Sequence, residues 1–414
     1  MLERSVSRRH FLGASAVGAV AGASALTSPA HAAAQAAGVK PADLPDLTIK
    51  EVKVYVIDLG PSAAKVTVEA YNRIASIVTR SGIEGNYTLP SRYFHLSGIN
   101  LGWLEYAKAV LPGKSVLDLP ALTSHYDPQI RRVGRFFFEA TIDNCLWDIL
   151  GKAVGLPIYR ILGAYRDRVL AYASSQHLKT VEDYVADVQK VKAEGFRAYK
   201  IHPPTLPGNV VDYRLDIEVA RAVRQAAGDG FPLIFDRVGT YNRYEAMAVG
   251  RALDELNYLG YEDPIPTSDI DGCVELCQAL DVPILIGEFL YSPYSFAEYI
   301  RRGALDVVRF VLDNVGGITA GMKIARLAEL FGMECTPHNW GETLDLASHF
   351  HCELAMPNCA WFEMTLPQGI GDRPYFKDRI RIARDGYVYA PTKPGLGYEI
   401  DHDVLDKMTK EIER

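Results

Sequence analysis

The sequence has no cluster of basic residues, and acidic side chains outnumber basic ones. It holds 51 Asp and Glu against 44 Lys and Arg, a formal net charge of −7. Such a chain is not expected to bind nucleic acid or an anionic membrane surface. After the first 32 residues, no segment is apolar for the ~20 residues that a membrane span needs. An acidic substrate is not excluded, because a metal ion and a few local cations can hold a carboxylate inside a negative protein.

Cysteine is also scarce, with six in 414 residues. These cysteines stand at apolar positions, and no spacing among them indicates a zinc site. We expect mostly free, buried thiols; the sequence does not show whether any two form a disulfide. The residues concerned are Cys145, Cys273, Cys277, Cys335, Cys352 and Cys359.

The first 32 residues have the pattern of a targeting segment. Arg8 and Arg9 precede an apolar stretch over residues 11–26, and small residues at 30–32 suit a cleavage site. This pattern resembles a twin-arginine signal peptide, so we expect export to the periplasm or beyond the cell. An N-terminal membrane anchor is the alternative, disfavoured because the stretch is short. Residues 33–45, rich in Ala and Pro, predict a linker.

From residue 169 onward, short apolar strands alternate with amphipathic helices. This pattern predicts parallel strands joined by crossover helices, and seven or eight such units close into a TIM-type barrel. A doubly wound open sheet is the competing α/β fold, but no Gly-rich nucleotide fingerprint follows the first strand. The expected strands cover 169–174, 198–201, 233–236, 258–262, 284–288, 307–313 and 333–336, and an eighth ends at Glu363.

The preceding third of the chain has a different pattern. A strand over 48–59 and a hairpin of 74–79 with 83–89 come before two helices, 103–111 and 135–154. This order predicts a separate α+β unit.

Three acidic residues end consecutive strands of the predicted barrel. Asp236, Glu262 and Glu288 are spaced 26 and 26 residues apart, one strand–helix unit each. In a barrel they would lie side by side at the C-terminal rim. Carboxylates about 4 Å apart repel by roughly 4 kcal/mol per pair, and no three matching cations are near in sequence. Any one alone would be an ordinary exposed charge, but the three together predict a divalent metal site, and oxygen ligands favour Mg²⁺.

Other polar residues end the remaining strands. Lys200 and His202 stand two apart on a strand, so both would face the barrel mouth. Asp313 and His338 are expected on neighbouring strand ends, where a carboxylate can orient an imidazole and raise its basicity. Each residue alone would more often be a satisfied polar group; together with Glu363 they are candidates for acid–base chemistry.

Several motifs together resemble the mandelate racemase and muconate lactonizing branch of the enolase superfamily. The motifs are the stretch 140–163, the three acids, Asp313 before Gly-Gly-Ile-Thr, His338 and Glu363. The resemblance covers about residues 46–400. It implies a (β/α)7β barrel over 166–375, an α+β capping domain over 46–165 and a segment 376–414 that completes the capping domain.

The resemblance also implies a chemistry. One Mg²⁺ per subunit, held by the three acids, would bind a small carboxylate substrate with Lys200 and Asn339. A base would take the proton alpha to the carboxylate and give an enolate, whose charge Glu363, if protonated, would help to hold. The resemblance further implies substrate-selecting loops near Pro61 and over 93–100, and a homo-oligomer.

The chain departs from the racemase pattern at His202, where that pattern has a second lysine. Dehydration needs one base, and His338, oriented by Asp313, could supply it; racemisation needs bases on both faces, so His202 or Lys200 would have to act. We therefore expect an acid-sugar dehydratase. The alternatives are a racemase or epimerase, a cycloisomerase and, more remotely, a non-catalytic periplasmic binding protein, which would show two similar lobes.

Overall fold

The computed structural model describes residues 37–40, 43–59, 71–89, 97–122 and 135–414. The predicted signal peptide, the predicted loop near Pro61 and residues 93–96 of the predicted loop 93–100 lie outside these residues; residues 97–100 are helical instead of forming a loop. Within the described ranges, every helix is too short or too polar to cross a membrane.

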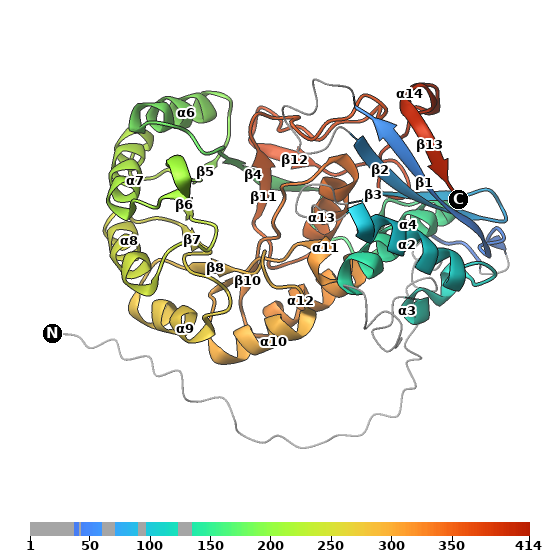
Figure 1. Ribbon diagram of the computed structural model, residues 1–414, viewed down its shortest axis with the longest axis horizontal. Helices are drawn as coiled ribbons and strands as arrows, with labels where there is room; N and C mark the ends of the chain where they lie inside the picture. The colour runs from blue at the N-terminus through green and yellow to red at the C-terminus, as the bar shows by residue number, and fades with distance from the viewer. Residues whose placement is uncertain (1–36, 41–42, 60–70, 90–96, 123–134) are drawn as a thin grey trace, which may run out of the picture.

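A four-stranded antiparallel sheet forms one side of the molecule (Figure 1). Its order is β13-β1-β2-β3, so the last strand of the chain pairs with the first, with Val54 opposite Glu413. Helices α2 and α4 pack against this sheet through buried residues such as Trp103 and Ile149. The bounds are β1 (Ile49–Asp58), β2 (Tyr71–Thr79), β3 (Glu84–Thr88), β13 (Thr409–Glu413), α2 (Ser97–Val110) and α4 (Arg135–Val154).

The second sheet holds eight parallel strands that follow one another in chain order, and the last, β11, pairs with the first, β4. Asn339, in the loop after β10, donates its backbone N–H to Glu363 of β11 and accepts from Thr365, which brings the two ends of the series together. The strands are β4 (Arg168–Ser174), β5 (Ala198–Ile201), β6 (Leu233–Asp236), β7 (Gly260–Glu262), β8 (Ile284–Ile286), β9 (Val307–Val308), β10 (Glu334–Cys335) and β11 (Trp361–Thr365).

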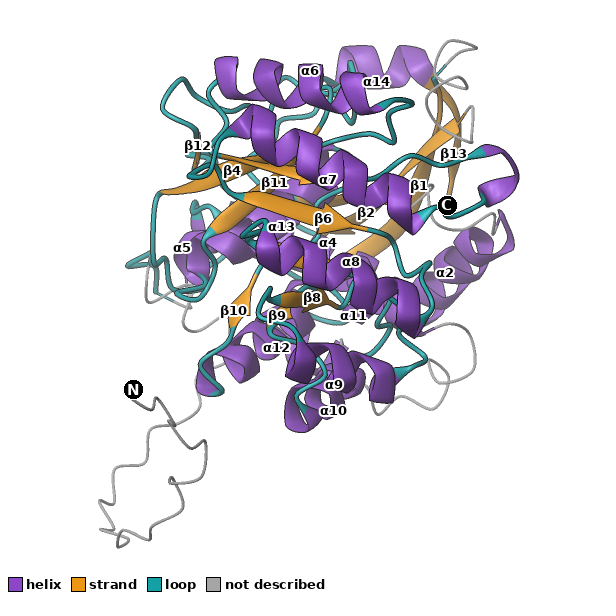
Figure 2. Cartoon of the chain, turned by 90° about the vertical axis from the view of Figure 1, so that its left-hand side faces the viewer, coloured by secondary structure: helices purple, strands orange, loops and turns teal. Residues whose placement is uncertain are grey.

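Helices surround these strands (Figures 1 and 2). Capping boxes at Thr180 and Asn242 fix where α6 and α8 begin. The helices of the ring are α6 (Val181–Ala193), α7 (Tyr213–Ala227), α8 (Arg243–Glu255), α9 (Ile270–Ala279), α10 (Pro293–Arg302), α12 (Ile318–Leu330) and α13 (Thr343–Ala355). The other elements are η3 (Val116–Asp118), α3 (Leu119–Leu122), α5 (Ile158–Ile161), η5 (Pro207–Asn209), α11 (Leu312–Val315), β12 (Tyr387–Tyr389) and α14 (His402–Met408).

The predicted fold class is confirmed: a β/α barrel stands beside an antiparallel capping sheet. The sixth barrel strand begins at Val307 as predicted, but the prediction that it extends to Asp313 is wrong. Strand β9 ends at Val308, and Asp313 lies in the short helix α11 instead of at a strand end. The predicted domain boundaries stay predictions.

The glycines after α11 bring the barrel close to the capping unit. Gly316 and Gly317 have φ of +104° and +86°, a region that favours glycine. A Cβ on Gly317 would lie 2.7 Å from the Cβ of Asp143 in α4. Two residues on, Thr319 donates its backbone N–H (2.8 Å) and its hydroxyl (2.5 Å) to Asp143. The Gly-Gly-Ile-Thr motif therefore anchors α12 on α4.

The six cysteines are free, as predicted, and five of them are buried. Cys277, in α9, is partly exposed.

Candidate active site

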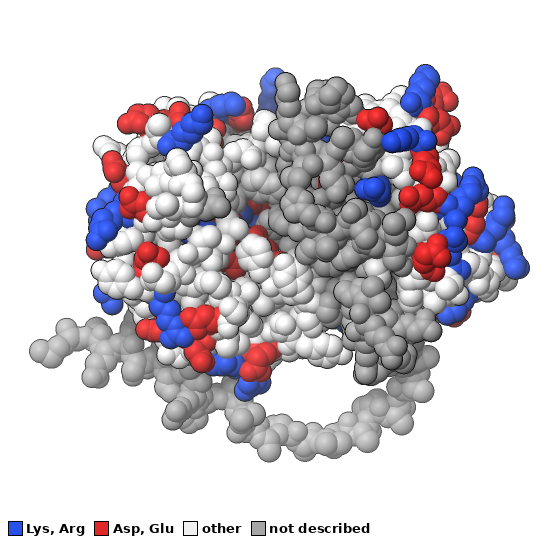
Figure 3. Space-filling view, in the orientation of Figure 1, with Lys and Arg blue, Asp and Glu red and all other residues white. Residues whose placement is uncertain are grey.

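Three carboxylates meet at the C-terminal rim of the barrel. Asp236 and Glu262 are the last residues of β6 and β7 and lie opposite each other in the sheet register. Glu288 follows β8 by two residues. One carboxylate oxygen of each lies within 4.8 Å of the others, and all three side chains are buried. Figure 3 shows acidic side chains in a hollow near the centre of this face.

The electrostatic environment of these three carboxylates, the metal trio, suits a divalent cation. Burial and the neighbouring acids Asp236 and Asp263 raise the pKa of Glu288 well above its ordinary value. Burial also raises the pKa of Glu262 to about 7, although Arg309 lowers it. A cation of charge +2 would relieve this repulsion, and an oxygen-only donor set favours Mg²⁺. The residues present therefore fit a divalent metal site.

Lys200 lies among the acids. Its ammonium is fully buried, 3.0 Å from Asp236 and 3.1 Å from Glu262. Burial lowers the pKa of Lys200, but Glu262, Glu363 and Asp236 outweigh burial and hold that pKa well above its ordinary value. The lysine is therefore a fixed positive charge at the metal trio.

Both ring nitrogens of His202 face oxygen atoms. Nδ1 lies 2.7 Å from the carbonyl oxygen of Ser175, and Nε2 lies 3.0 Å from Oδ2 of Asp236. Both oxygens are hydrogen-bond acceptors, so the ring faces acceptor atoms of the protein on both sides. His202 thus directly contacts Asp236, one of the three acids of the metal trio. Its ring also meets Trp340 edge-on, with centroids 5.0 Å apart.

His338 has a different environment. Its Nε2 lies 3.1 Å from Glu288, so the ring stands at the metal trio. Its backbone N–H donates to the carbonyl oxygen of Phe310. Burial lowers the pKa of His338 well below its ordinary value, although Glu363 raises it. The ring is therefore neutral near pH 7 and keeps a lone pair.

Asp313 lies in α11 and not at the strand end where it was expected. The hydroxyl of Tyr87, from the capping strand β3, lies 2.8 Å from Asp313 and 3.1 Å from Asp345. Burial and the charge of Asp345 raise the pKa of Asp313 to about 8. The reason is the early end of β9, which places Asp313 in α11 against β3 and α13. Asp313 links the barrel to the capping sheet, and its predicted role in orienting His338 has no support from these contacts.

Arg309 is a site residue that we did not predict from the sequence. Directly after β9, its fully buried guanidinium contacts both Glu262 and Glu363. Burial raises the pKa of Glu363, but Arg309 and Lys200 outweigh it and hold that pKa well below its ordinary value. Glu363 is thus ionised rather than protonated. A signal did exist, because Arg309 is a lone charge in the apolar run 307–312.

Asn339 is fully buried. Its side-chain amide donates to Glu353 (2.8 Å), and its backbone N–H donates to Glu363 (2.8 Å). These contacts give Asn339 a structural role, and its predicted role in substrate binding stays a prediction.

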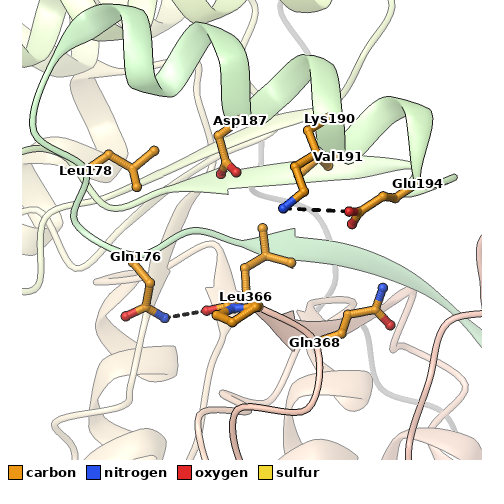
Figure 4. Close-up of a pocket in the computed structure, with 9 residues that line it drawn as sticks. Gln176, Leu178, Asp187, Lys190, Val191, Glu194, Leu366 and Gln368 are labelled. Carbon is orange, nitrogen blue, oxygen red and sulfur yellow. Dashed lines mark hydrogen bonds and ion pairs between the residues drawn. The ribbon is translucent and has the colours of Figure 1, made fainter. Parts of the chain in front are cut away.

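A pocket of about 390 Å³ is lined by residues other than the three acids of the metal trio (Figure 4). It lies between α6 and the segments that follow β4 and β11, and Gln176 closes one side by donating to the carbonyl oxygen of Leu366 (2.6 Å). Its lining is Gln176, Leu178, Asp187, Lys190, Val191, Glu194, Leu366, Pro367 and Gln368.

Comparison with known proteins agrees with this geometry. Residues 183–404 match the family described as "Enolase C-terminal domain-like", the C-terminal domain of mandelate racemase and muconate lactonizing enzymes. The protein belongs to the enolase superfamily. The chain is 33% identical to an L-talarate/galactarate dehydratase of Salmonella typhimurium over 335 residues, which are 79% of this chain and 80% of the relative.

Two further similarities concern reaction and metal. A D-galactarolactone cycloisomerase of Agrobacterium fabrum is 31% identical over 276 residues, 64% of this chain and 71% of the relative. The crystal structure of a D-glucarate dehydratase from Agrobacterium tumefaciens, complexed with magnesium, superimposes with a TM-score of 0.77. The match has 28% identity and covers 89% of this chain and all of the other. Relatives of this superfamily member thus include sugar-acid dehydratases and a cycloisomerase.

Proposed function

We propose that this protein is a Mg²⁺-dependent dehydratase of a sugar acid. One observation carries the proposal: three buried carboxylates, a buried lysine and a neutral histidine meet at one barrel rim. Asp236, Glu262 and Glu288 would hold the metal. When bound, the metal supplies positive charge that stabilises a substrate carboxylate as its α-carbon loses a proton.

The residues of the chain then have separate roles. Lys200 offers its fixed positive charge to the substrate carboxylate. His338 accepts the α-proton on a ring nitrogen, which breaks the C–H bond and leaves an enolate. The β C–O bond then breaks, and the proton from His338 converts the departing hydroxide to water. The enol that remains tautomerises to a keto acid, so one histidine is sufficient when both groups lie on one face.

The contacts of His202 favour dehydration over racemisation. Racemisation needs a second base on the opposite face of the substrate, and the candidates from the sequence were His202 and Lys200. His202 has both nitrogens turned to acceptors, and Lys200 lies within 3.1 Å of each of three carboxylates. Cycloisomerisation is the second candidate, because one relative has that activity by name.

The test is a screen of sugar acids with Mg²⁺, read as loss of water by mass spectrometry. A parallel experiment in D₂O follows α-proton exchange by NMR. We expect a metal-dependent loss of water from a hydroxylated acid, together with exchange. Exchange without loss of water would favour a racemase, and ring opening of a lactone would favour a cycloisomerase. A protein that catalyses none of these reactions with any acid tested would refute the proposal.

We also propose export by the twin-arginine route, on the evidence of Arg8 and Arg9 before the apolar stretch 11–26. Replacing both arginines with lysine should keep the precursor in the cytoplasm, as read by cell fractionation and mass spectrometry of the mature N-terminus. Unchanged export of that variant would refute this proposal.

A further inference from the structure

Four charged side chains form a closed ring inside the barrel. Lys200 lies 3.1 Å from Glu262 and 2.8 Å from Glu363, and Arg309 contacts the same two glutamates. Each cation therefore touches both anions, and each anion touches both cations. All four side chains have no exposed surface, so water does not screen these contacts.

The ring is one layer of the barrel interior. Its members come from β5, β7, β11 and the residue directly after β9, which are alternate strands. Side chains inside such barrels stack in layers of four from alternate strands. The layer beneath is apolar and includes Ala198, two residues before Lys200 on the same face of β5. The charged ring thus covers the apolar interior, and Glu262 joins the ring to the metal trio.

The charges of the ring balance without a metal. Two positive and two negative side chains cancel, so Glu262 is already neutralised within the ring. Asp236 and Glu288, the other two acids of the metal trio, lie outside the ring. Arg309 cannot move away from this arrangement easily, because its guanidinium also donates to the hydroxyl of Tyr172 (3.0 Å) and to the carbonyl oxygens after β10 (3.3 and 3.4 Å).

We propose that Arg309 is a positioning residue that serves as the built-in counter-cation of the metal site. It holds Glu262 and Glu363 in place whether or not metal is bound, and its charge limits how tightly the site binds a divalent cation. The inference rests on the metal site of the proposed function. It is tested by metal affinity and thermal stability and does not require a measurement of turnover.

The experiment compares the wild type with Arg309→Met, which keeps an unbranched chain without the charge. Mn²⁺ and Mg²⁺ affinities are measured by calorimetry, and melting temperatures with EDTA and with saturating metal. We expect Arg309→Met to bind Mn²⁺ at least roughly tenfold more tightly, because less positive charge opposes the ion. Its metal-free melting temperature should fall, because two buried carboxylates would then share the single charge of Lys200, and metal should raise that temperature more than in the wild type. Equal or weaker binding by Arg309→Met would overturn the proposal.

Two further variants keep the test decisive if Arg309→Met folds poorly. Arg309→Lys restores the charge and should restore the wild-type affinity within about threefold, since charge sets the effect. The double variant Arg309→Met with Glu363→Gln removes one charge of each sign, so it should also bind Mn²⁺ within about threefold of the wild-type affinity. Tenfold tighter binding by either variant, or failure of the double variant to fold even with metal, would also overturn the role of Arg309. A wild-type protein that binds no divalent metal would instead refute the proposed function.

Discussion

At the scale of the residue, two histidines on the same rim differ in what their ring nitrogens contact. His202 is engaged on both sides, whereas His338 is neutral and stands at Glu288. We predict that His338→Asn lowers α-proton exchange by about 10²–10⁴-fold, the usual contribution of a general base. His202→Asn is the matched control: at saturating Mg²⁺ it should retain exchange and show weaker metal binding. Loss of exchange in His202→Asn alone would reverse the two roles.

Glu262 belongs to both the metal trio and the charged ring. Glu262→Gln keeps the shape but removes the charge, so we predict loss of metal-dependent activity with an unchanged circular dichroism spectrum. The control is Glu298→Gln, an exposed glutamate paired with Arg301 on α10, which should retain full activity because exposed pairs contribute little. Full activity of Glu262→Gln, or of the wild type after EDTA treatment, would rule out the metal assignment.

At the scale of the element, the contact between α12 and α4 depends on a glycine without room for a side chain. We predict that Gly317→Ala destabilises the protein by more than the roughly 1–3 kcal/mol of an unfavourable φ, because its Cβ would clash with Asp143. Gly332→Ala is the control, with a φ of +70° and no atom within 4 Å of the added Cβ. Urea denaturation measures the free energy of unfolding of both variants and so separates the clash from the backbone strain. An equal decrease in the two variants would show that the clash does not destabilise the protein.

The same contact makes stability depend on pH. Burial raises the pKa of Asp143 to about 7, against 3.8 for an ordinary aspartate. Between these two pH values the folded protein keeps a proton that the unfolded chain has lost. The free energy of unfolding therefore falls as pH rises from about 4 to about 7. The largest effect is about 4 kcal/mol. Asp143→Asn cannot ionise, so its free energy of unfolding should fall less than that of the wild type between pH 5 and pH 8. Parallel pH profiles of the two proteins would contradict the assignment.

The elements also show what the sequence could and could not predict. The alternation of strands and helices and the spacing of Asp236, Glu262 and Glu288 were sufficient for the barrel and for the metal trio. The spacing did not predict that β9 stops at Val308, because the turn into α11 depends on packing against α4 and α13. Asp313 was therefore placed at the wrong position, and Arg309 was overlooked because its partners are 47 and 54 residues away.

At the scale of the whole molecule, the two ends of the chain meet in the capping sheet. Strand β13 covers one edge of β1, pairing residues 54–57 with residues 409–413. The capping sheet in turn contacts the barrel through Tyr87 on β3 and through Asn72 on β2, whose amide donates to Glu342 before α13. The last residues of the chain thus help to fix a sheet that packs on the barrel that carries the metal trio.

This arrangement predicts the effect of removing the last strand. Deleting residues 409–414 leaves the edge of β1 unpaired, so we expect a melting temperature lower by at least about 1 °C, the shift for roughly 1 kcal/mol in a chain of this length, and concentration-dependent aggregation through that edge. Deleting Arg414 alone is the control, because it chiefly removes an exposed ion pair with Glu51 and should leave the melting temperature nearly unchanged. Metal affinity should be retained in both, since the three ligands and the charged ring lie on barrel strands or directly after them. Loss of metal binding in the longer deletion would instead show that the capping sheet holds the barrel rim in shape.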